Sequence, residues 1–345
     1  MIESIEFTNY KALRKTTLPL APFTLLLGPN GSGKSSVLDA IANIAVISKS
    51  APKHHGISVL NANWVPERNV ANLDTSVEIR LRSLLNTQDL GVVFKWVDQG
   101  NRVHVSYENN KAKVVPQEDV EPLINWLTNM QVFALEPRAI AGSAMVNSNP
   151  LQRNGGGLAA VLDHLRDKDE RWNSLKDEMR RWLPEYTSIE FDTPRDGHKS
   201  ISLVTKKGGH RIPATALSQG TLVSIALLTL AYMPNPPTLV ALEEIDRGLH
   251  PRLLRHLQDA LYRLAYPESC GETRPPIQVI ATTHSPYLLD LYRDHPEEVV
   301  LAEKEGLDVQ FKRLTDIEHY EDILGQSPLS EVWYSGVLGG VSVKP

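Results

Sequence analysis

The stretch GPNGSGKSS, residues 28–36, decides the fold of this 345-residue chain. It fits the pattern G-x-x-x-x-G-K-[ST], and it overlaps the end of the short apolar run FTLLLG, which is typical of a buried central strand. Apolar residues at helical spacing then continue from Gly33 to Ile47. A strand, a glycine-rich loop and a helix in this order predict an α/β fold in which the loop holds the phosphates of ATP or GTP.

Each part of this phosphate loop has an expected role. Its glycines let backbone N–H groups turn toward the phosphates, and the start of the helix adds positive potential. We expect Lys34 to neutralise the β- and γ-phosphates and Ser35 to give a hydroxyl ligand to Mg²⁺. The expected nucleotide contacts are Gly28, Pro29, Asn30, Gly31, Ser32, Gly33, Lys34, Ser35 and Ser36.

Composition narrows the class of protein. Hydrophobic residues make up 41% and charged residues 22% of the chain, as in ordinary globular proteins. The net charge of −5 does not indicate a generally basic, DNA-binding protein. If the protein binds DNA, we expect it to do so through a local basic patch or through a partner. The single cysteine, Cys270, excludes internal disulfides and predicts a reducing, cytoplasmic setting. The longest apolar run, at 222–233, is shorter than the roughly 20 residues that span a membrane, so we expect a buried helix.

The pattern changes along the chain. Apolar and polar residues alternate over 73–115, with turn residues at 99–100 and 109–110, which predicts an antiparallel meander. The charged stretch at 170–183 is typical of a solvated helix, and a DNA-facing surface there is the alternative. We also expect helices near 33–47, 119–130, 157–167 and 251–265, strands near 131–135, 187–192, 199–206, 210–214, 238–244 and 277–284, and a hairpin at 298–314.

Two carboxylates follow an apolar strand in TLVALEEIDRGLHP, residues 238–251. Adjacent carboxylates at the end of an apolar strand usually bind a cation or water. The alternative interpretation is that they simply lie at an exposed strand end. We expect Glu243 to hold the Mg²⁺ shell through water, and Glu244 to polarise the water that attacks the γ-phosphate. His284 ends the next apolar strand, where ligands gather in parallel sheets, and is interpreted as a γ-phosphate sensor rather than a structural histidine.

The stretch ALSQG, residues 216–220, gains meaning from its place in the chain. Alone, Ser218 is a good N-cap for a buried helix. The order phosphate loop, LSQG, acidic strand and strand-histidine, however, resembles that of ABC-type ATPases. The resemblance implies a head-to-tail homodimer or a higher assembly, in which Ser218, Gln219 and Gly220 of one chain cap the γ-phosphate held by Lys34 of another.

Four stretches narrow the resemblance to the soluble heads of SMC, RecF and OLD proteins. They are IEFTNYKALRK, GPNGSGKSSVLDAI, EEIDRGLHP and THSPYLLD. The ending LSEVWYSGVLGGV is similar to stand-alone AAA-family ATPases of bacterial defence operons. This resemblance implies an ABC-type P-loop head with a mixed or parallel core sheet, an antiparallel β lobe and a helical insertion. It also implies Mg²⁺-dependent hydrolysis through Lys34, Glu244 and His284, with Lys11 near the nucleotide.

The resemblance also sets the expected domains. We predict an ATPase head of residues 1–135 and 187–345, with the meander at 73–115 inside it, and a helical insertion at 136–186. Some features depart from the family pattern: Glu243 stands where most relatives have aspartate, and Gln131 precedes its strand, so the glutamine loop is not placed. About 50 residues follow the helix after His284, too few for an added nuclease domain, so we expect any cutting activity to belong to a partner.

These features favour an ATP-driven switch. It would dimerise around two ATP molecules, hydrolyse them slowly and control an effector such as a nuclease or toxin, in anti-phage defence or DNA repair. DNA would be contacted directly or through that partner. The alternatives are the nucleotide-binding subunit of a membrane transporter, which the missing glutamine loop disfavours, and a scaffold that binds nucleotide without hydrolysing it.

Overall fold

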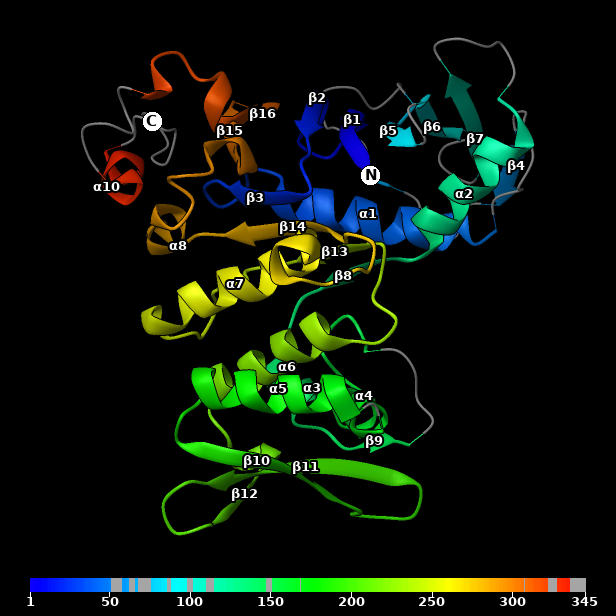
Figure 1. Cartoon of the computed structure of the whole chain (residues 1–345). Helices are drawn as coiled ribbons and strands as arrows, with labels where there is room; N and C mark the ends of the chain where they lie inside the picture. Colours follow the sequence, from blue (N-terminus) through cyan, green and yellow to red (C-terminus); the bar gives the residue numbers. More distant parts are fainter. Residues whose placement is uncertain are drawn as a thin grey trace. The chain divides into compact units, whose positions relative to one another are not determined.

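The computed structural model forms two compact units (Figure 1). The first comprises residues 1–132, 238–241 and 278–345, and the second comprises 133–237 and 242–277. The structure describes residues 1–50, 58–61, 66–67, 76–85, 88–97, 102–109, 115–146, 151–167, 169–306, 308–321 and 328–335.

A mixed six-stranded sheet forms the centre of the first unit, in the order β16-β15-β3-β14-β13-β8. Strands β14 and β15 both run parallel to β3, and β16 returns antiparallel to β15. Every residue of β3, β13 and β14 is buried, as expected for strands covered on both faces. The bounds are β3 Phe23–Leu27, β8 Met130–Phe133, β13 Leu239–Leu242, β14 Gln278–Thr283, β15 Val299–Glu305 and β16 Asp308–Arg313.

A second sheet of the first unit is antiparallel, in the order β2-β1-β5-β6-β7-β4. Its strands β5, β6 and β7 confirm the predicted meander, whereas the turn at 99–100 and residues 110–114 lie outside the described residues. Apolar side chains of both sheets and of helices α1 and α2 form one buried core. The bounds are β1 Ile2–Tyr10, β2 Leu13–Pro19, β4 Ser58–Asn61, β5 Glu78–Leu85, β6 Gln88–Val97, β7 Arg102–Asn109, α1 Lys34–Ser48 and α2 Gln117–Thr128.

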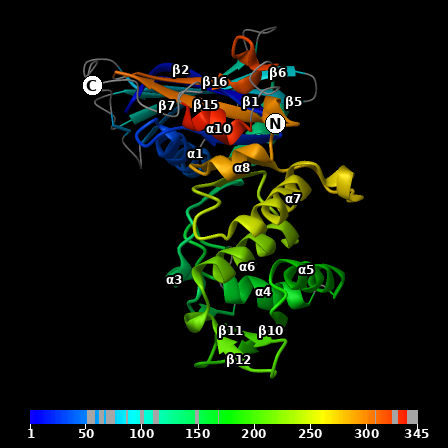
Figure 2. The ribbon, with the colours of Figure 1, turned by 90° about the vertical axis from the view of Figure 1, so that its left-hand side faces the viewer.

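The predicted C-terminal hairpin is confirmed as β15 and β16. Strand β16 contacts β2, as Figure 2 also shows, so the hairpin connects the two sheets of this unit. The short helices α8 (Pro286–Asp290) and α10 (Leu329–Tyr334) pack together, and the Ser330 N–H donates to Asp290 Oδ1 at 2.8 Å.

One buried side chain joins the two sheets directly. Gln278 begins β14 and is fully buried. Its Oε1 accepts from the Ile2 N–H at 3.0 Å, and its Nε2 donates to the carbonyl oxygens of Ile2 at 2.7 Å and Ala21 at 3.0 Å. One side chain thereby bonds three backbone groups, which fixes the start of β1 against the core sheet.

The second unit surrounds the apolar helix α6. Helices α3, α4, α5 and α7 contact α6. A four-stranded antiparallel sheet, in which β11 pairs with β10, β12 and the short β9, packs against α4 and α5. Residues 221–232 of α6 are all buried, as the sequence predicts. The bounds are α3 Pro137–Ile140, β9 Ala144–Met145, α4 Leu158–Arg166, α5 Asp169–Trp182, β10 Tyr186–Asp192, β11 His198–Thr205, β12 Arg211–Pro213, α6 Gln219–Tyr232 and α7 Leu254–Ala265.

Two further expectations can be compared with these elements. The predicted insertion, 136–186, falls within the second unit, and its independence as a domain stays a prediction. Gln131 was expected to precede its strand, but β8 already begins at Met130, so Gln131 lies inside it. In the ranges described above, no helix combines the length and the apolar composition needed to cross a membrane.

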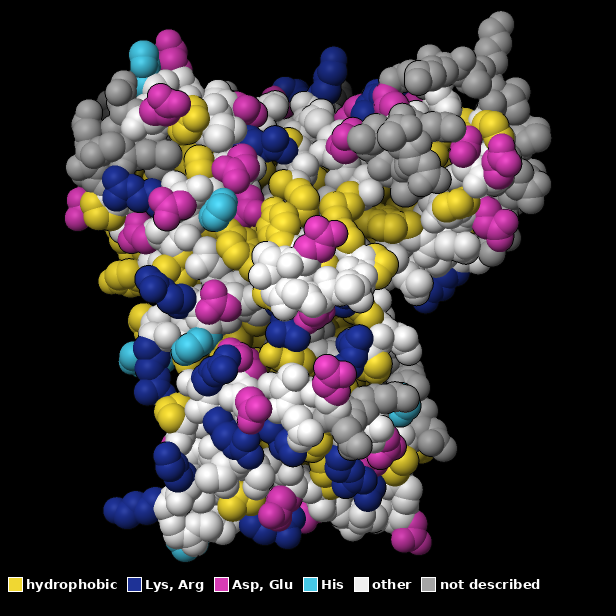
Figure 3. Space-filling model, in the orientation of Figure 1, with side chains coloured by type: hydrophobic (Ala, Val, Ile, Leu, Met, Phe, Trp, Pro, Cys, Tyr) yellow, Lys and Arg dark blue, Asp and Glu magenta, His cyan; other side chains and the backbone are white. Residues whose placement is uncertain are grey.

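The two units differ in charge. The first contains 18 Lys and Arg against 24 Asp and Glu, and the second contains 18 against 17. Figure 3 shows Lys and Arg over the helices and strands of the second unit. On α5, however, Arg180 pairs with Asp177 at 2.7 Å and Arg181 pairs with Glu178 at 2.9 Å. These pairs favour the solvated-helix interpretation of 170–183 over a DNA-binding face.

We predict that Gln278→Met lowers the free energy of unfolding by about 3 kcal/mol, because it removes three hydrogen bonds to backbone groups. Urea denaturation measures the loss. Gln310→Met is the matched control, since Gln310 is exposed and its contacts with Thr16 and Lys15 are 3.4 and 3.5 Å long. Equal stabilities of the two variants would contradict the joining role of Gln278.

Candidate nucleotide-binding site

The backbone of the phosphate loop requires its glycines. The loop leaves β3 after Leu27, and α1 begins at Lys34. Gly31 and Gly33 have φ of 76° and 83°, in the left-handed region that glycine adopts without strain. At Gly28 a Cβ would lie 2.6 Å from the Ala302 carbonyl oxygen, so this glycine allows a close backbone approach.

Lys34 is positioned within the curve of the loop. The side chain is buried, and Nζ donates to the carbonyl oxygens of Gly28 at 2.8 Å and Pro29 at 2.9 Å. Nζ also lies 3.3 Å from the Ser32 hydroxyl. Asn30 and Ser35 are exposed on the loop and at the start of α1. An ammonium group inside a glycine-rich loop, with an accessible hydroxyl beside it, fits a phosphate group and its Mg²⁺.

His284 emerges beside the phosphate loop. Strands β14 and β3 are parallel, and their register places Thr283 opposite Leu27. His284 and Gly28 are the next residues on the two strands, so they leave the same edge of the sheet at the same level. His284 is exposed. This register brings His284 to the edge of the sheet from which the phosphate loop starts, and its role as a γ-phosphate sensor stays a prediction.

Lys11 contacts the helix that follows the loop. It has a φ of 48°, its N–H donates to the Glu67 carbonyl at 3.0 Å, and its Nζ lies 3.4 Å from Asp39 Oδ2 on α1. The adjacent Tyr10 is buried, and burial raises the pKa of its hydroxyl, so the ring stays neutral beside the lysine. The structure therefore brings Lys11 to the helix that begins with Lys34, and its contact with nucleotide stays a prediction.

The two expected carboxylates lie in the second unit, just beyond β13. The strand ends at Leu242, two residues earlier than predicted, because Glu244 takes a left-handed backbone with φ of 48°. The Glu243 N–H donates to the Phe133 carbonyl at 2.8 Å, which joins the ends of β13 and β8. Non-glycine residues in this conformation are strained and gather at functional sites.

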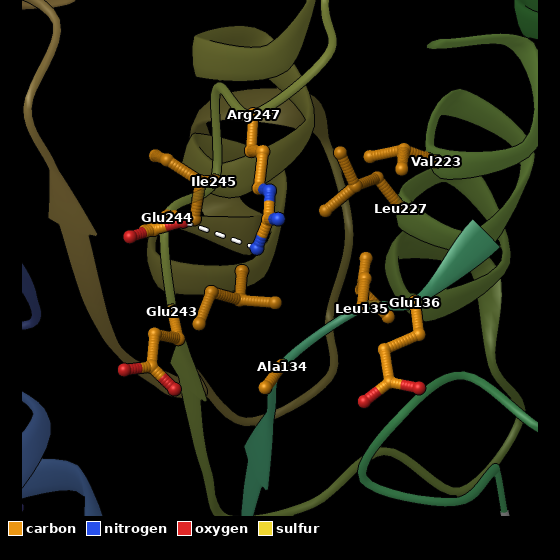
Figure 4. Close-up of a pocket in the computed structure, with 10 residues that line it drawn as sticks. Ala134, Leu135, Glu136, Val223, Leu227, Glu243, Glu244, Ile245 and Arg247 are labelled. Carbon is orange, nitrogen blue, oxygen red and sulfur yellow. Dashed lines mark hydrogen bonds and ion pairs between the residues drawn. The ribbon is translucent and has the colours of Figure 1, made fainter. Parts of the chain in front are cut away.

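These carboxylates line a cavity of about 250 Å³, the carboxylate cavity. Arg247 Nη1 lies 3.4 Å from Glu244 Oε2 across a short turn (Figure 4). The Glu244 side chain remains 42% exposed, so solvent reaches it. The cavity is lined by Ala134, Leu135, Glu136, Val223, Leu227, Leu242, Glu243, Glu244, Ile245 and Arg247.

Glu136 is a lining residue that the sequence analysis missed. It follows β8 as Glu243 follows β13, and Figure 4 shows the two carboxylates on either side of Ala134. Glu136 directly follows the strand expected at 131–135, where a glutamine rather than an acid is the family pattern. A general rule for polar residues after any strand of the core sheet would have found it.

The ALSQG stretch forms the capped start of α6. The Ser218 hydroxyl accepts from the Thr221 N–H at 3.2 Å, and Ser218 and Gln219 are exposed. Gly220 packs on the turn that follows the carboxylates, since a Cβ on it would lie 2.6 Å from the Gly248 carbonyl oxygen. Ser218 and Gln219 are therefore accessible to another molecule, whereas Gly220 packs against the backbone of Gly248.

The residues available for Mg²⁺ are single oxygen donors. Ser35 belongs to the first unit and Glu243 to the second. Within the described residues, no group of three or more His, Cys, Asp or Glu is arranged to hold a metal. An ion held by Ser35 would take most of its ligands from phosphate and water, which Mg²⁺ favours at nucleotide sites.

Two family models match the chain. One, described as "AAA domain, putative AbiEii toxin, Type IV TA system", matches residues 118–290, just over half of the chain. The other, "AAA ATPase domain", matches residues 1–128. Together they cover the phosphate loop, the ALSQG stretch, the carboxylates and His284.

The chain is similar in sequence to parts of two longer proteins. The OLD nuclease of Thermus scotoductus is 22% identical over 335 aligned residues, covering 85% of this chain and 60% of that protein. The chromosome partition protein Smc of Methanocaldococcus jannaschii is 43% identical over 53 residues, which are 15% of this chain and 4% of that protein. This chain therefore spans less than two thirds of each of these relatives.

A solved structure shows the fold. It is described as a crystal structure of the SmcHead bound to the C-winged helix domain of ScpA, and it superposes with a TM-score of 0.59 at 15% identity. The match covers 90% of this chain and 97% of that one. The mixed α/β fold is therefore that of an SMC-type ATPase head, as the sequence predicts.

Gly220→Ala is expected to destabilise the protein by about 1–2 kcal/mol, because the new methyl group meets a backbone oxygen. At a solvent-exposed position inside a helix, glycine to alanine raises the free energy of unfolding by up to about 1 kcal/mol. The sign of the change in the free energy of unfolding therefore tests the close contact. Gly91→Ala in β6 is the control, since its nearest atom would be 3.5 Å away. A gain in the urea midpoint for Gly220→Ala would contradict the close contact.

Proposed function

The chain belongs to the AAA-domain family whose model covers residues 118–290, and we propose that it is an ABC-type ATP-driven switch. In this proposal it binds ATP, pairs head-to-tail with a second copy around two nucleotides, and hydrolyses them slowly. The single observation that carries it is Lys34, held inside the loop by the carbonyl oxygens of Gly28 and Pro29. ATP is preferred to GTP because the matched families and the fold are those of ATPases.

Binding begins at the phosphate loop. Lys34 exchanges two neutral carbonyl acceptors for phosphate oxygens, whose negative charge strengthens each hydrogen bond. The 15-residue helix α1 directs its positive end at the same group, and the Ser35 hydroxyl is available to a Mg²⁺ ion that neutralises the phosphates. Contacts of Gly28, Pro29, Asn30, Gly31, Ser32, Gly33 and Ser36 are part of this proposal.

Hydrolysis uses the carboxylates and the histidine. Glu244 orients the attacking water, Glu243 contacts the Mg²⁺ shell through water, and His284 donates to the γ-phosphate. Support comes from the strained backbone of Glu244 and from the length of its ion pair with Arg247, 3.4 Å, which would let the carboxylate turn to water. The register of His284 with Gly28 supports its part.

The second copy completes the site. Ser218 and Gln219 are exposed at the start of the 14-residue helix α6, whose free N–H groups and dipole favour an anion. In the proposed pair, this end caps the γ-phosphate bound by the other copy. Gly220 contributes by letting the helix start close against Gly248.

In this proposal the switch controls the activity of an effector protein. We propose that the switch controls a nuclease or toxin effector, and the resemblance to an OLD nuclease over 85% of this chain supports this proposal. A role in anti-phage defence or DNA repair, with DNA contacted directly or through that partner, is part of the proposal. The alternative is a scaffold that binds ATP in the same way and never hydrolyses it. Measuring hydrolysis in the wild type and in Glu244→Gln distinguishes this scaffold from the switch.

We predict that Glu244→Gln lowers ATP hydrolysis by at least about 100-fold, because the amide cannot accept the proton of the attacking water. Its ATP affinity is expected to stay within about twofold of the wild-type value. Phosphate release and equilibrium binding measure the two quantities. Glu268→Gln, at an exposed acid of the same unit, should keep full activity. Hydrolysis that persists in Glu244→Gln would remove the catalytic assignment.

The second prediction concerns assembly. With Mg-ATP, the molar mass of Glu244→Gln protein should rise from 38.4 kDa to about twice that value, because unhydrolysed ATP keeps the pair closed. Light scattering measures it. Adding Ser218→Arg should abolish the rise, whereas Ser269→Arg, at another exposed serine, should not. A protein that binds ATP and stays at the mass of one chain would contradict the shared site.

A further inference from the structure

A second lysine lies beside the phosphate loop, on the C-terminal hairpin. Strand β15 runs parallel to β3, and Leu301 stands opposite Leu27, the last residue of β3. Strand β15 continues to Glu305, so its final residues extend past the end of β3 and alongside the loop. Strand β16 supports this extension, since Lys304 pairs with Val309 across the hairpin.

Alternating residues of β15 face the loop. The Cβ of Ala302 lies 2.9 Å from the position that a Cβ on Gly28 would occupy. Lys304 is two residues further along, on the same face of the strand. Its Nζ lies 4.0 Å from the position that a Cβ on Gly31 would occupy. Two neighbouring side chains of β15 therefore follow two glycines of the loop.

The two lysines near the loop differ in exposure. Lys34 is buried among the loop carbonyls, whereas Lys304 and Gly31 are both exposed. The neighbouring acid Glu303 belongs to the opposite face of β15 and pairs with Lys312 at 2.9 Å. The charge of Lys304 thus lies beside Gly31, at an exposed part of the loop.

We propose that Lys304 is a second phosphate-binding lysine, which contacts the terminal phosphate of the nucleotide held by Lys34. This inference rests on the proposed binding of ATP at the loop. An ammonium on the accessible side adds an attraction that grows with the negative charge of the ligand. Lys304 therefore strengthens the binding of a nucleoside triphosphate more than that of a diphosphate.

The test compares ATP and ADP on full-length variants. Lys304→Gln keeps most of the side-chain length and removes the charge. With Mg²⁺ present, calorimetry should show ATP binding weakened by about 5- to 10-fold and ADP binding by no more than about twofold. Lys304→Arg should restore the ATP affinity. Lys312→Gln, on the same hairpin, should bind both nucleotides as the wild type does.

The outcomes separate this inference from the proposed function. If the wild type does not bind ATP, or if Lys34→Ala binds it equally well, the proposed function fails. If ATP binding depends on Lys34 but Lys304→Gln leaves it unchanged, or weakens ATP and ADP by the same factor, only the role of Lys304 is overturned. Raising the salt concentration should reduce the difference between wild type and Lys304→Gln, as for any exposed charge.

Discussion

The close approach of Gly28 to Ala302 is the constraint on which the first unit depends. No side chain fits between these two backbones, because even a Cβ would come within 2.6 Å of a carbonyl oxygen. The contact lets β15 run beside the phosphate loop, and it lets the loop curve back so that its carbonyls reach the Lys34 ammonium. The left-handed backbone at Gly31 and Gly33 completes the same curve.

Local pattern was sufficient for much of the fold and of the candidate site. The phosphate loop, the buried helix α6, the meander and the strand before His284 each depend on residues that are close in sequence. Lys304 could not be found this way, because its place beside the loop comes from β15 being the neighbour of β3. Glu136 becomes a candidate only when β8 is known to belong to the core sheet. Gln278 is similar: a glutamine at the start of a strand has no visible partner until β1 is placed beside it.

The side chains of the proposed reaction belong to both structural units. Lys34, Ser35 and His284 belong to the first unit, and Glu243, Glu244 and Ser218 belong to the second. Within each unit the groups are fixed by backbone contacts: strand register for His284, and the Glu243–Phe133 hydrogen bond for the carboxylates. The fold is that of an SMC-type head, and the family model at 118–290 spans the carboxylates, Ser218 and His284.

The packing of Gly220 on Gly248 has a mechanical consequence. The start of α6 and the turn after Glu244 touch through backbone atoms, with no flexible side chain between them to absorb a displacement. Arg247, next to Gly248, is also the ion-pair partner of Glu244. A displacement of the exposed start of α6 would therefore press directly on this turn. In the proposed pair, contact at Ser218 would then be felt at the carboxylates of the same chain.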